Sequence, residues 1–154
     1  MSLTITSSDF AHMGEIPLVH TCDGQDTSPK LSWSGVPNGV SSLAMIVDDP
    51  DAPDPAAPKT TWIHWVLYNM APDSCGLTSA AQLPPGTREG LNDWKRIGYA
   101  GPCPPVGTHR YFFKLYALDI TLPDLGTPTK ADLEKAMIGH VVAQTELIGL
   151  YRRG

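Results

Sequence analysis

The chain has 154 residues, with 11 basic and 16 acidic side chains and a formal net charge of −5 at pH 7. Its length and its lack of repeats or linkers predict a single domain over residues 1–154. No long basic run is present, which disfavours a nucleic-acid partner, and no apolar run approaches the ~20 residues that span a bilayer. The first residues carry no secretory signal, so we expect a cytoplasmic protein without stable membrane insertion.

The three cysteines are Cys22, Cys75 and Cys103, an odd number without any CxxC spacing. This pattern argues against a disulfide framework or a zinc knuckle, and we expect three reduced thiols. The chain also holds 14 glycines and 15 prolines outside any low-complexity tract. Such a composition indicates many turns between short elements and favours a β-rich fold.

Several short runs rich in β-branched and aromatic residues predict strands, because each is bounded by Gly, Pro, Asn or Asp. In chain order they are 3–6, 31–33, 42–47, 61–69 and 110–120. The last two runs alternate with a period of two, and both faces of each are largely apolar. The alternation places Trp62 and His64 on one face with Val66, and His109 on one face with Tyr111. We therefore expect two central strands in a sheet with a second layer packed against it.

One helix is predicted near the C-terminus, in the stretch TPTKADLEKAMIGH. Thr129 can cap its start, Asp132 stands in the capping-box position, and Gly139 ends it. The following residues, 140–153, are ambiguous between helix and strand. Their β-branched valines and their alternation favour a strand.

Four aspartates crowd the stretch IVDDPDAPDP behind an apolar run. A calcium loop is excluded, because counting from Asp49 the sixth position is not Gly and the twelfth is not Glu. Carboxylates and prolines commonly end a strand and solvate a turn, an interpretation that suits Asp51 and Asp54 best. For Asp48 and Asp49, at the strand end, a place in the wall of a binding pocket is the stronger hypothesis.

His64 and His109 lie in or beside aromatic, buried strands, where an imidazole needs a hydrogen-bonding partner. Three interpretations stay open from the residues alone. The rings are satisfied core residues, or they join Asp49 in a two-histidine, one-carboxylate metal site, or they form with Tyr111 a polar cup for an anion. A fourth possibility is an enzyme with Cys103 as nucleophile and a histidine as base, although a cysteine among prolines is not typical of an activated thiol.

Three motifs taken together, DDPDAP, WIHWVLYNM and GPCPPVGTHRYFFKLYALD, resemble the phosphatidylethanolamine-binding protein family, also called the Raf kinase inhibitor protein family. The segments TCDGQDTSPKLSWSGVP and GHVVAQTELIGLYRR are similar to its bacterial and archaeal branch, so the resemblance covers nearly the whole chain. It implies a mainly β fold, with a large central antiparallel sheet packed against a smaller sheet and one or two short helices. It also implies a pocket at one end of the sheet.

The resemblance further implies what the pocket binds. The expected function is non-enzymatic binding of a small phosphate-containing or other anionic ligand, with a regulatory, kinase-inhibitor-like role by similarity only and with neither cofactor nor metal. A phosphorylated protein and a second copy of the chain, as in bacterial relatives, are further partners that it suggests. Ala52-Pro53 is its candidate for a cis peptide bond. The implied ligand-binding residues are Asp49, Pro53, Trp62, His64, Pro105, His109 and Tyr111. Cys103 stands where eukaryotic members usually have glycine, and we expect it to line the pocket as a small packed thiol.

The mechanism expected for such a site is binding without chemistry. N–H groups of His64, His109 and the loop backbone hold the anion, while Asp49 orients a histidine or accepts from a ligand's amine. Because an unperturbed histidine titrates near 6.5, affinity for phosphate is then expected to fall as the pH rises from about 5.5 to 8. The alternative function is a hydrolase-type enzyme that uses the Asp, His, His metal site or the Cys103 nucleophile.

Overall fold

The computed structural model describes residues 2–79 and 82–153, whose strands form two sheets. The large sheet has the order β2-β9-β8-β4-β5-β7 and the small sheet the order β1-β3-β6. The elements in chain order are β1 (Thr4–Thr6), β2 (Gly14–Glu15), the 3-10 turn η1 (Leu18–His20), β3 (Leu31–Ser34), β4 (Ser42–Ala52), β5 (Thr60–Met70), β6 (Gly76–Leu77), β7 (Arg88–Glu89), β8 (His109–Leu118), α1 (Lys130–Met137) and β9 (Val141–Tyr151).

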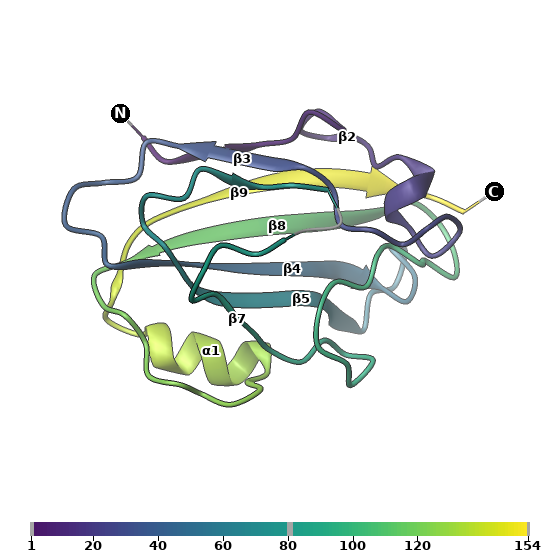
Figure 1. The fold of residues 1–154 in the computed structure, drawn as a ribbon. Helices are drawn as coiled ribbons and strands as arrows, with labels where there is room; N and C mark the ends of the chain where they lie inside the picture. The colour runs from purple at the N-terminus through teal and green to yellow at the C-terminus, as the bar shows by residue number, and fades with distance from the viewer. Residues whose placement is uncertain (1, 80–81, 154) are drawn as a thin grey trace.

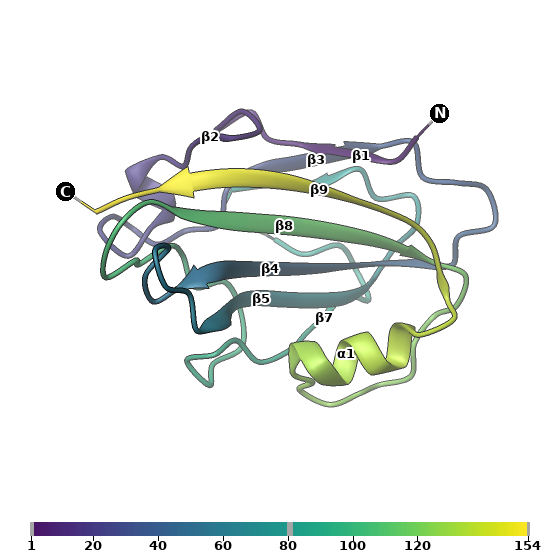
Figure 2. The ribbon, with the colours of Figure 1, turned by 180° about the vertical axis from the view of Figure 1, so that it is seen from behind.

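This architecture confirms the fold class that the resemblance implied, with the difference that the large sheet is not wholly antiparallel. At its edge the short β2 pairs in parallel with β9. The small sheet lies on the side of the large sheet that faces the viewer in Figure 1. From behind, β9, β8, β4 and β5 face the viewer, and α1 lies beside the lower edge of the sheet (Figure 2).

Two hydrophobic clusters hold these layers together. Between the two sheets, Trp33 of the small sheet shares a cluster with Phe113 and Leu147 of the large sheet. On the opposite face, Leu133 of α1 joins a cluster with Ile46 of β4. Full burial of one such side chain stabilises the fold by roughly 1.5–3 kcal/mol, so both faces of the central strands contribute to stability.

The predicted strands are all present, and most end within two residues of their expected limits. The short β2, β6 and β7 were not predicted, because two-residue strands carry no detectable alternation. In β8 the alternation is as expected, with His109 and Tyr111 buried on the inner face. The outer face is less covered than expected, since Phe112 and Tyr116 are only half-buried.

Strand β5 departs from the expected alternation at His64. Asp48 pairs with Ile63 and Val47 pairs with Trp65, so His64 is an extra residue in β5 relative to β4. Such a β-bulge re-aims side chains and is common beside binding sites. The expectation that His64 shares a face with Val66 is wrong, because Val66 belongs to the cluster under α1 while His64 turns toward the other side.

The C-terminal elements confirm the sequence interpretation. The Thr129 side chain accepts from the Asp132 N–H, and the Asp132 side chain accepts from the Thr129 N–H, which completes the capping box of α1. The helix ends just before Gly139, whose φ of 81° is a conformation that favours glycine. The segment that follows is the long strand β9. Within the described residues, no helix is long and apolar enough to cross a membrane.

Candidate ligand-binding pocket

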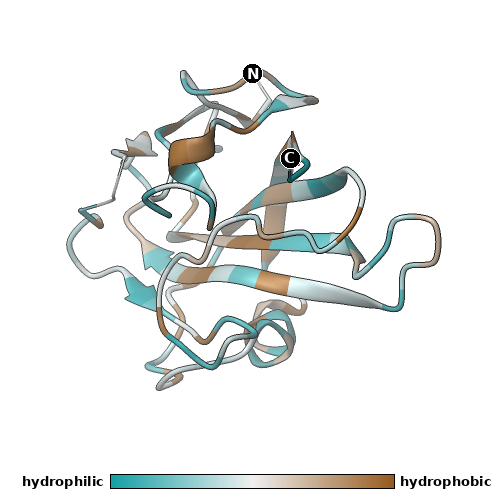
Figure 3. Cartoon of the chain, turned by 90° about the vertical axis from the view of Figure 1, so that its right-hand side faces the viewer, coloured by the Kyte–Doolittle hydropathy of each residue, from teal (hydrophilic) through white to brown (hydrophobic). Residues whose placement is uncertain are grey.

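A pocket of about 330 Å³ opens at the end of the large sheet where β4 ends and where β5 and β8 begin. Figure 3 views the molecule from this end, and the brown turn near the C-terminus is η1, whose Leu18 and Val19 are exposed. Each of the ligand-binding residues predicted from the sequence lines this one pocket. Their role in binding stays a prediction. The lining residues are Asp49, Ala52, Pro53, Trp62, His64, Trp94, Cys103, Pro104, Pro105, His109 and Tyr111.

Asp49 and His109 form a buried pair in the pocket wall. His109 Nδ1 lies 2.6 Å from Asp49 Oδ2, and His109 Nε2 lies 2.9 Å from the carbonyl oxygen of Val106. A carbonyl oxygen can only accept, so Nε2 carries a hydrogen and donates it. The 2.6 Å contact requires one further proton, located on either Nδ1 or Oδ2. The pair is therefore electrically neutral overall, and both nitrogens of His109 are already engaged.

The carboxyl group of this pair is held from a second side. Its Oδ1 accepts the N–H of Asp51 at 2.7 Å. Burial raises the pKa of Asp49, although the hydrogen bonds from His109 and the Asp51 N–H act against that shift. Protein groups thus use both oxygens of Asp49, which makes it a fixed part of the wall.

His64 lines the pocket, and only its Nδ1 is hydrogen-bonded to the protein within residues 2–79 and 82–153. Its Nδ1 lies 2.6 Å from the carbonyl oxygen of Ala100, so Nδ1 carries the hydrogen and donates it. Burial lowers the pKa of His64 to about 4, against the opposing effect of the backbone carbonyls of Ala100 and Gly101 and of the Asp48 charge. The ring is therefore neutral above pH 5, and its Nε2 is an acceptor.

The two histidines thus differ from the expected anion donors. His109 has no free N–H, and the neutral His64 presents a lone pair. Burial opposes the gain of a proton by His64 between pH 5.5 and 8. For this histidine, the predicted rise in anion affinity through protonation therefore loses its basis.

Tyr111 supplies the donor that the histidines lack. Its hydroxyl is buried, and among the described residues it has no hydrogen-bond partner. Burial raises the pKa of Tyr111 far above its usual value, so the hydroxyl keeps its hydrogen. The ring lies edge-on to His64, with 5.2 Å between ring centroids, and both side chains line the pocket.

Aromatic side chains form the outer wall of the pocket. Trp62 and Trp94 meet edge to face at 5.5 Å between centroids, and Trp94 also contacts the His64 ring at 5.1 Å. Trp94 was missed by the sequence analysis, because it lies in the irregular segment between β7 and β8, outside the three matched motifs. A tryptophan in an otherwise polar segment, NDWKR, is the signal that was available.

The loop after Ala100 is tied covalently to the N-terminal part of the chain. Cys103 forms a disulfide bond with Cys22, with 5.4 Å between the Cα atoms. The expectation of three reduced thiols is therefore wrong for these two residues, because the fold brings together cysteines 81 positions apart. Cys75 is exposed and free. A sulfur atom in a disulfide is no thiolate, so Cys103 in this state is not the nucleophile of the enzyme alternative.

Hydrogen bonds join the same two segments. The Cys22 N–H donates to the Pro102 carbonyl, and the Gly101 N–H donates to Asp26 Oδ1 at 2.7 Å. A Cβ atom on Gly101 would lie 2.2 Å from the His20 carbonyl oxygen, so this close approach requires glycine. The carbonyl that orients His64 thus belongs to a firmly anchored loop.

The remaining aspartates of the acidic stretch are structural. Asp51 is buried and accepts two hydrogen bonds from the Arg110 guanidinium, at 2.9 and 3.0 Å. These bonds lower the pKa of Asp51. The interpretation of Asp51 as a turn-solvating residue is therefore wrong, since β4 continues to Ala52. Asp54 does cap a turn, because its side chain accepts the Ala56 N–H.

Asp48 does not face the pocket, contrary to the hypothesis for it. Successive strand residues point to opposite sides, and Asp48 meets Lys114 at 3.0 Å and Lys130 at 2.9 Å on the outer face. Lys130 begins α1, so this ion cluster fastens the helix to the sheet. The cis bond implied by the resemblance is present at Ala52-Pro53, where the chain leaves β4.

The metal alternative finds no arrangement to support it. No cluster of three or more His, Cys, Asp or Glu among residues 2–79 and 82–153 is placed to hold a metal ion. In the expected set, hydrogen bonds within the protein already occupy His109 on both nitrogens and Asp49 on both oxygens.

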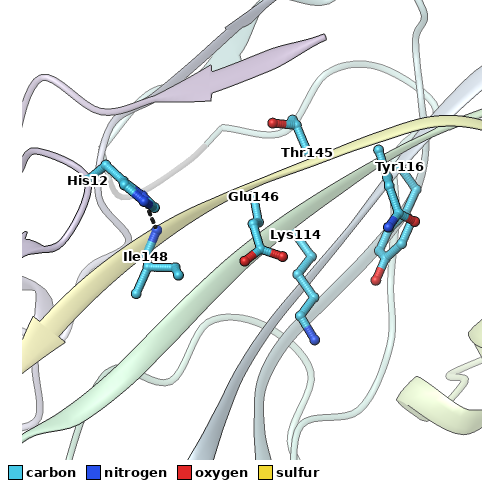
Figure 4. Close-up of a pocket in the computed structure, with 7 residues that line it drawn as sticks. His12, Lys114, Tyr116, Thr145, Glu146 and Ile148 are labelled. Carbon is cyan, nitrogen blue, oxygen red and sulfur yellow. Dashed lines mark hydrogen bonds between the residues drawn. The ribbon is translucent and has the colours of Figure 1, made fainter.

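A second hollow, of about 560 Å³, lies on the outer face of β8 and β9 (Figure 4). His12 Nδ1 accepts the Ile148 N–H there, and Lys114 points away toward Asp48. Glu146 lies opposite Lys114 in the strand pairing. The polar groups of this open surface face solvent or have partners, so the end pocket is the stronger candidate site.

Comparison with known proteins agrees with this geometry. The family model described as phosphatidylethanolamine-binding protein matches residues 6–152. The UPF0098 protein of Methanothermobacter thermautotrophicus is 49% identical, over 99% of this chain and 100% of that protein. The UPF0098 protein of Chlamydia muridarum is 42% identical, over 98% of this chain and 99% of that protein.

Solved structures show the same likeness. A protein from Chlamydia trachomatis, described as a phosphatidylethanolamine-binding protein homologue, matches with a TM-score of 0.93 and 42% identity over 99% of each chain. YbcL of E. coli, described as a new member of the mammalian PEBP family, matches with a TM-score of 0.89 and 30% identity over 100% of each chain.

Proposed function

The chain belongs to the phosphatidylethanolamine-binding protein family, and on that premise we propose that it is a non-enzymatic protein that binds a small phosphate-containing or other anionic ligand in its end pocket. The observation that carries the proposal is the buried Tyr111 hydroxyl, which has no partner among the described residues. A buried polar group without a partner costs roughly 1–3 kcal/mol, so the pocket is incomplete without a ligand oxygen or water.

Further donors stand at the outer wall. The half-buried Trp62 and Trp94 line the pocket, and each carries an indole N–H, a group that can only donate. The neutral Asp49–His109 pair adds no negative charge to repel an anion. One anionic oxygen at Tyr111 and another near the indoles is the arrangement that we expect.

No reaction is required of these residues. The sulfur of Cys103 is bonded to Cys22, and protein hydrogen bonds hold Asp49 and His109 in place. A phosphorylated protein side chain presents the same chemistry as a small phosphate ester, so such a partner fits a regulatory role. Pairing of two copies and residence in the cytoplasm stay predictions, of which light scattering tests the first.

Calorimetric titration with inorganic phosphate and with phosphoethanolamine tests the proposal. Both are expected to bind one site per chain, and Tyr111→Phe is expected to weaken binding by about tenfold or more, since the anion loses a buried donor. Tyr116→Phe is the matched control on the same strand, because Tyr116 lies on the outer face. Absence of binding to the folded wild type, or equal loss in both variants, would overturn the proposal.

A further inference from the structure

We propose that the pocket selects oxyanions that bring a hydroxyl group of their own, such as hydrogen phosphate or a singly protonated phosphate monoester, over oxyanions without a hydrogen, such as sulfate. The inference rests on the proposed function and names the protonation state of its ligand. The observation behind it is the balance of donors and acceptors among the buried side chains of the pocket.

His64 is the acceptor that requires such a ligand. Its Nδ1 donates to the Ala100 carbonyl at 2.6 Å, which fixes the tautomer with the hydrogen on Nδ1. Nε2 then holds a lone pair, and the side chain lines the pocket. An anionic oxygen placed there would face another acceptor, whereas a P–O–H group donates to it.

Three side chains around His64 offer no donor for that lone pair. His109 uses Nδ1 toward Asp49 and Nε2 toward the Val106 carbonyl. Proline lacks an N–H, so Pro104 and Pro105 line the pocket without a donor. The Tyr111 hydroxyl can serve either His64 or the ligand, and a ligand that carries both a hydroxyl and an anionic oxygen satisfies both groups at once.

Both side chains line the same pocket, and we expect one tetrahedral oxyanion to contact both. The rings of His64 and Tyr111 lie 5.2 Å apart at nearly right angles. Hydrogen phosphate offers a donor to Nε2 and an acceptor to the Tyr111 hydroxyl. Sulfate offers acceptors alone, and leaving Nε2 opposite an anionic oxygen is expected to lower its affinity by about tenfold or more.

The pH dependence of binding then belongs to the ligand. The titratable groups that act on His64 are Asp48 from β4 and His109 from β8, and the Tyr111 hydroxyl of β8 contacts its ring. Burial keeps His64 neutral above pH 5. A phosphate monoester loses its hydroxyl hydrogen at a pKa of about 6, while inorganic phosphate keeps one hydrogen through its dianion.

Three probes separate these cases in calorimetric titrations of the whole protein at about pH 5.5 and 8. Inorganic phosphate carries a hydroxyl at both values, methyl phosphate chiefly at the lower value, and sulfate at neither. We expect phosphate to bind at both, methyl phosphate to weaken about tenfold or more at the higher pH, and sulfate to bind at least about tenfold more weakly than phosphate throughout.

His64→Ala tests the residue behind the selectivity. Removal of Nε2 is expected to bring the affinities for phosphate and sulfate to within about threefold of each other, which a purely structural role would not do. The control is His140→Ala, at the far end of the sheet, where the ring pairs with Asp119. Circular dichroism and the midpoint of urea unfolding verify that both variants are folded, and His64→Phe, which also lacks an acceptor, replaces His64→Ala if the latter is not.

The outcomes separate this inference from the proposed function. Equal binding of phosphate and sulfate by the wild type, or unchanged selectivity in the folded His64 variant, overturns the inference and leaves the anion site standing. Absence of phosphate binding at both pH values overturns the proposed function and the inference together.

Discussion

Asp48 and Asp49 are neighbours in β4, yet the two faces of the sheet treat their carboxyl groups in opposite ways. On the outer face, Asp48 meets two lysine ammonium groups within 3.0 Å. On the inner face, Asp49 shares a proton with His109 and borders a pocket whose Tyr111 hydroxyl has no partner in the described part of the chain. The first arrangement uses charge to fasten a helix, and the second removes charge and leaves hydrogen-bonding capacity for a ligand.

One strand thus serves both the stability of the fold and the binding pocket. Asp48 Oδ2 receives both lysines, and its Oδ1 has no partner among the described residues. In this ion cluster, attraction between the Asp48 carboxylate of β4 and the ammonium groups of Lys114 in β8 and Lys130 in α1 holds the three elements together. The pocket, in contrast, is set by hydrogen-bond direction, because its acidic and basic groups are neutral as a pair.

The largest effect is expected from removing both cations of the outer face. The double variant Lys114→Met, Lys130→Met leaves Asp48, which is 1% exposed, as an uncompensated buried charge. We expect the free energy of unfolding to fall by about 3–5 kcal/mol while phosphate affinity stays the same. Urea denaturation and calorimetry measure the two quantities.

The exposed ion pair of Arg88 with Asp124 offers a matched control. Arg88→Met is expected to change the free energy of unfolding by less than about 1 kcal/mol, because solvent screens that pair. A double lysine variant as stable as this control would show that the two faces do not differ as described.

The next largest effect is expected on the inner face, where burial disfavours the charged form of His64. The pKa of His64 is about 4 in the folded protein, against 6.5 without burial. The unfolded chain therefore binds this proton first, so stability present above pH 6.5 is lost as the pH falls toward 4, by about 3 kcal/mol. Urea midpoints between pH 4.5 and 7 measure the loss.

His64→Gln provides the comparison, because glutamine can donate to the Ala100 carbonyl and does not titrate. Its unfolding free energy is expected to change less over the same pH range. An identical slope in the two proteins would show that His64 accepts a proton in the folded state as readily as in the unfolded chain.

The smallest effect tests the single shared proton of the pocket pair. In Asp49→Asn, the amide N–H replaces that proton permanently and can donate to His109 Nδ1, so we expect a loss below about 1 kcal/mol. Asp49→Ala leaves the His109 nitrogen and the Asp51 N–H without partners, and about 1–3 kcal/mol is expected to be lost. Thermal and urea unfolding of the two variants measure these losses in the free energy of unfolding. A loss above about 1 kcal/mol in Asp49→Asn would favour a full ion pair.

The sequence predicted elements whose signals are local. Alternation located the long strands, and the spacing of Thr129 and Asp132 located the start of α1, because a capping box involves neighbours within one turn. The family resemblance supplied the end pocket, since the matched motifs lie at the ends of β4, β5 and β8. The burial of Asp51 was missed, because its partner Arg110 lies 59 positions away.

Features that depend on how distant segments pair in the folded chain could not be predicted from local sequence patterns. The bulge at His64 depends on how β5 pairs with β4, and one inserted residue changes which side chains share a face. The tautomer of His64 depends on the Ala100 carbonyl, 36 positions later in the chain. Those two features, more than residue type, turn the expected anion donor into an acceptor.

The disulfide bond between Cys22 and Cys103 makes one wall of the pocket dependent on the redox environment of the cell. Disulfide bonds persist in secreted and periplasmic proteins and in the interiors of hyperthermophiles, and they are rare in the cytosol of other organisms. Protein isolated from its own cells with thiols trapped at lysis will carry one free thiol, that of Cys75, if the bond forms there, and three if it does not. The number of free thiols therefore shows whether the chain matured in an environment that permits disulfide bonds.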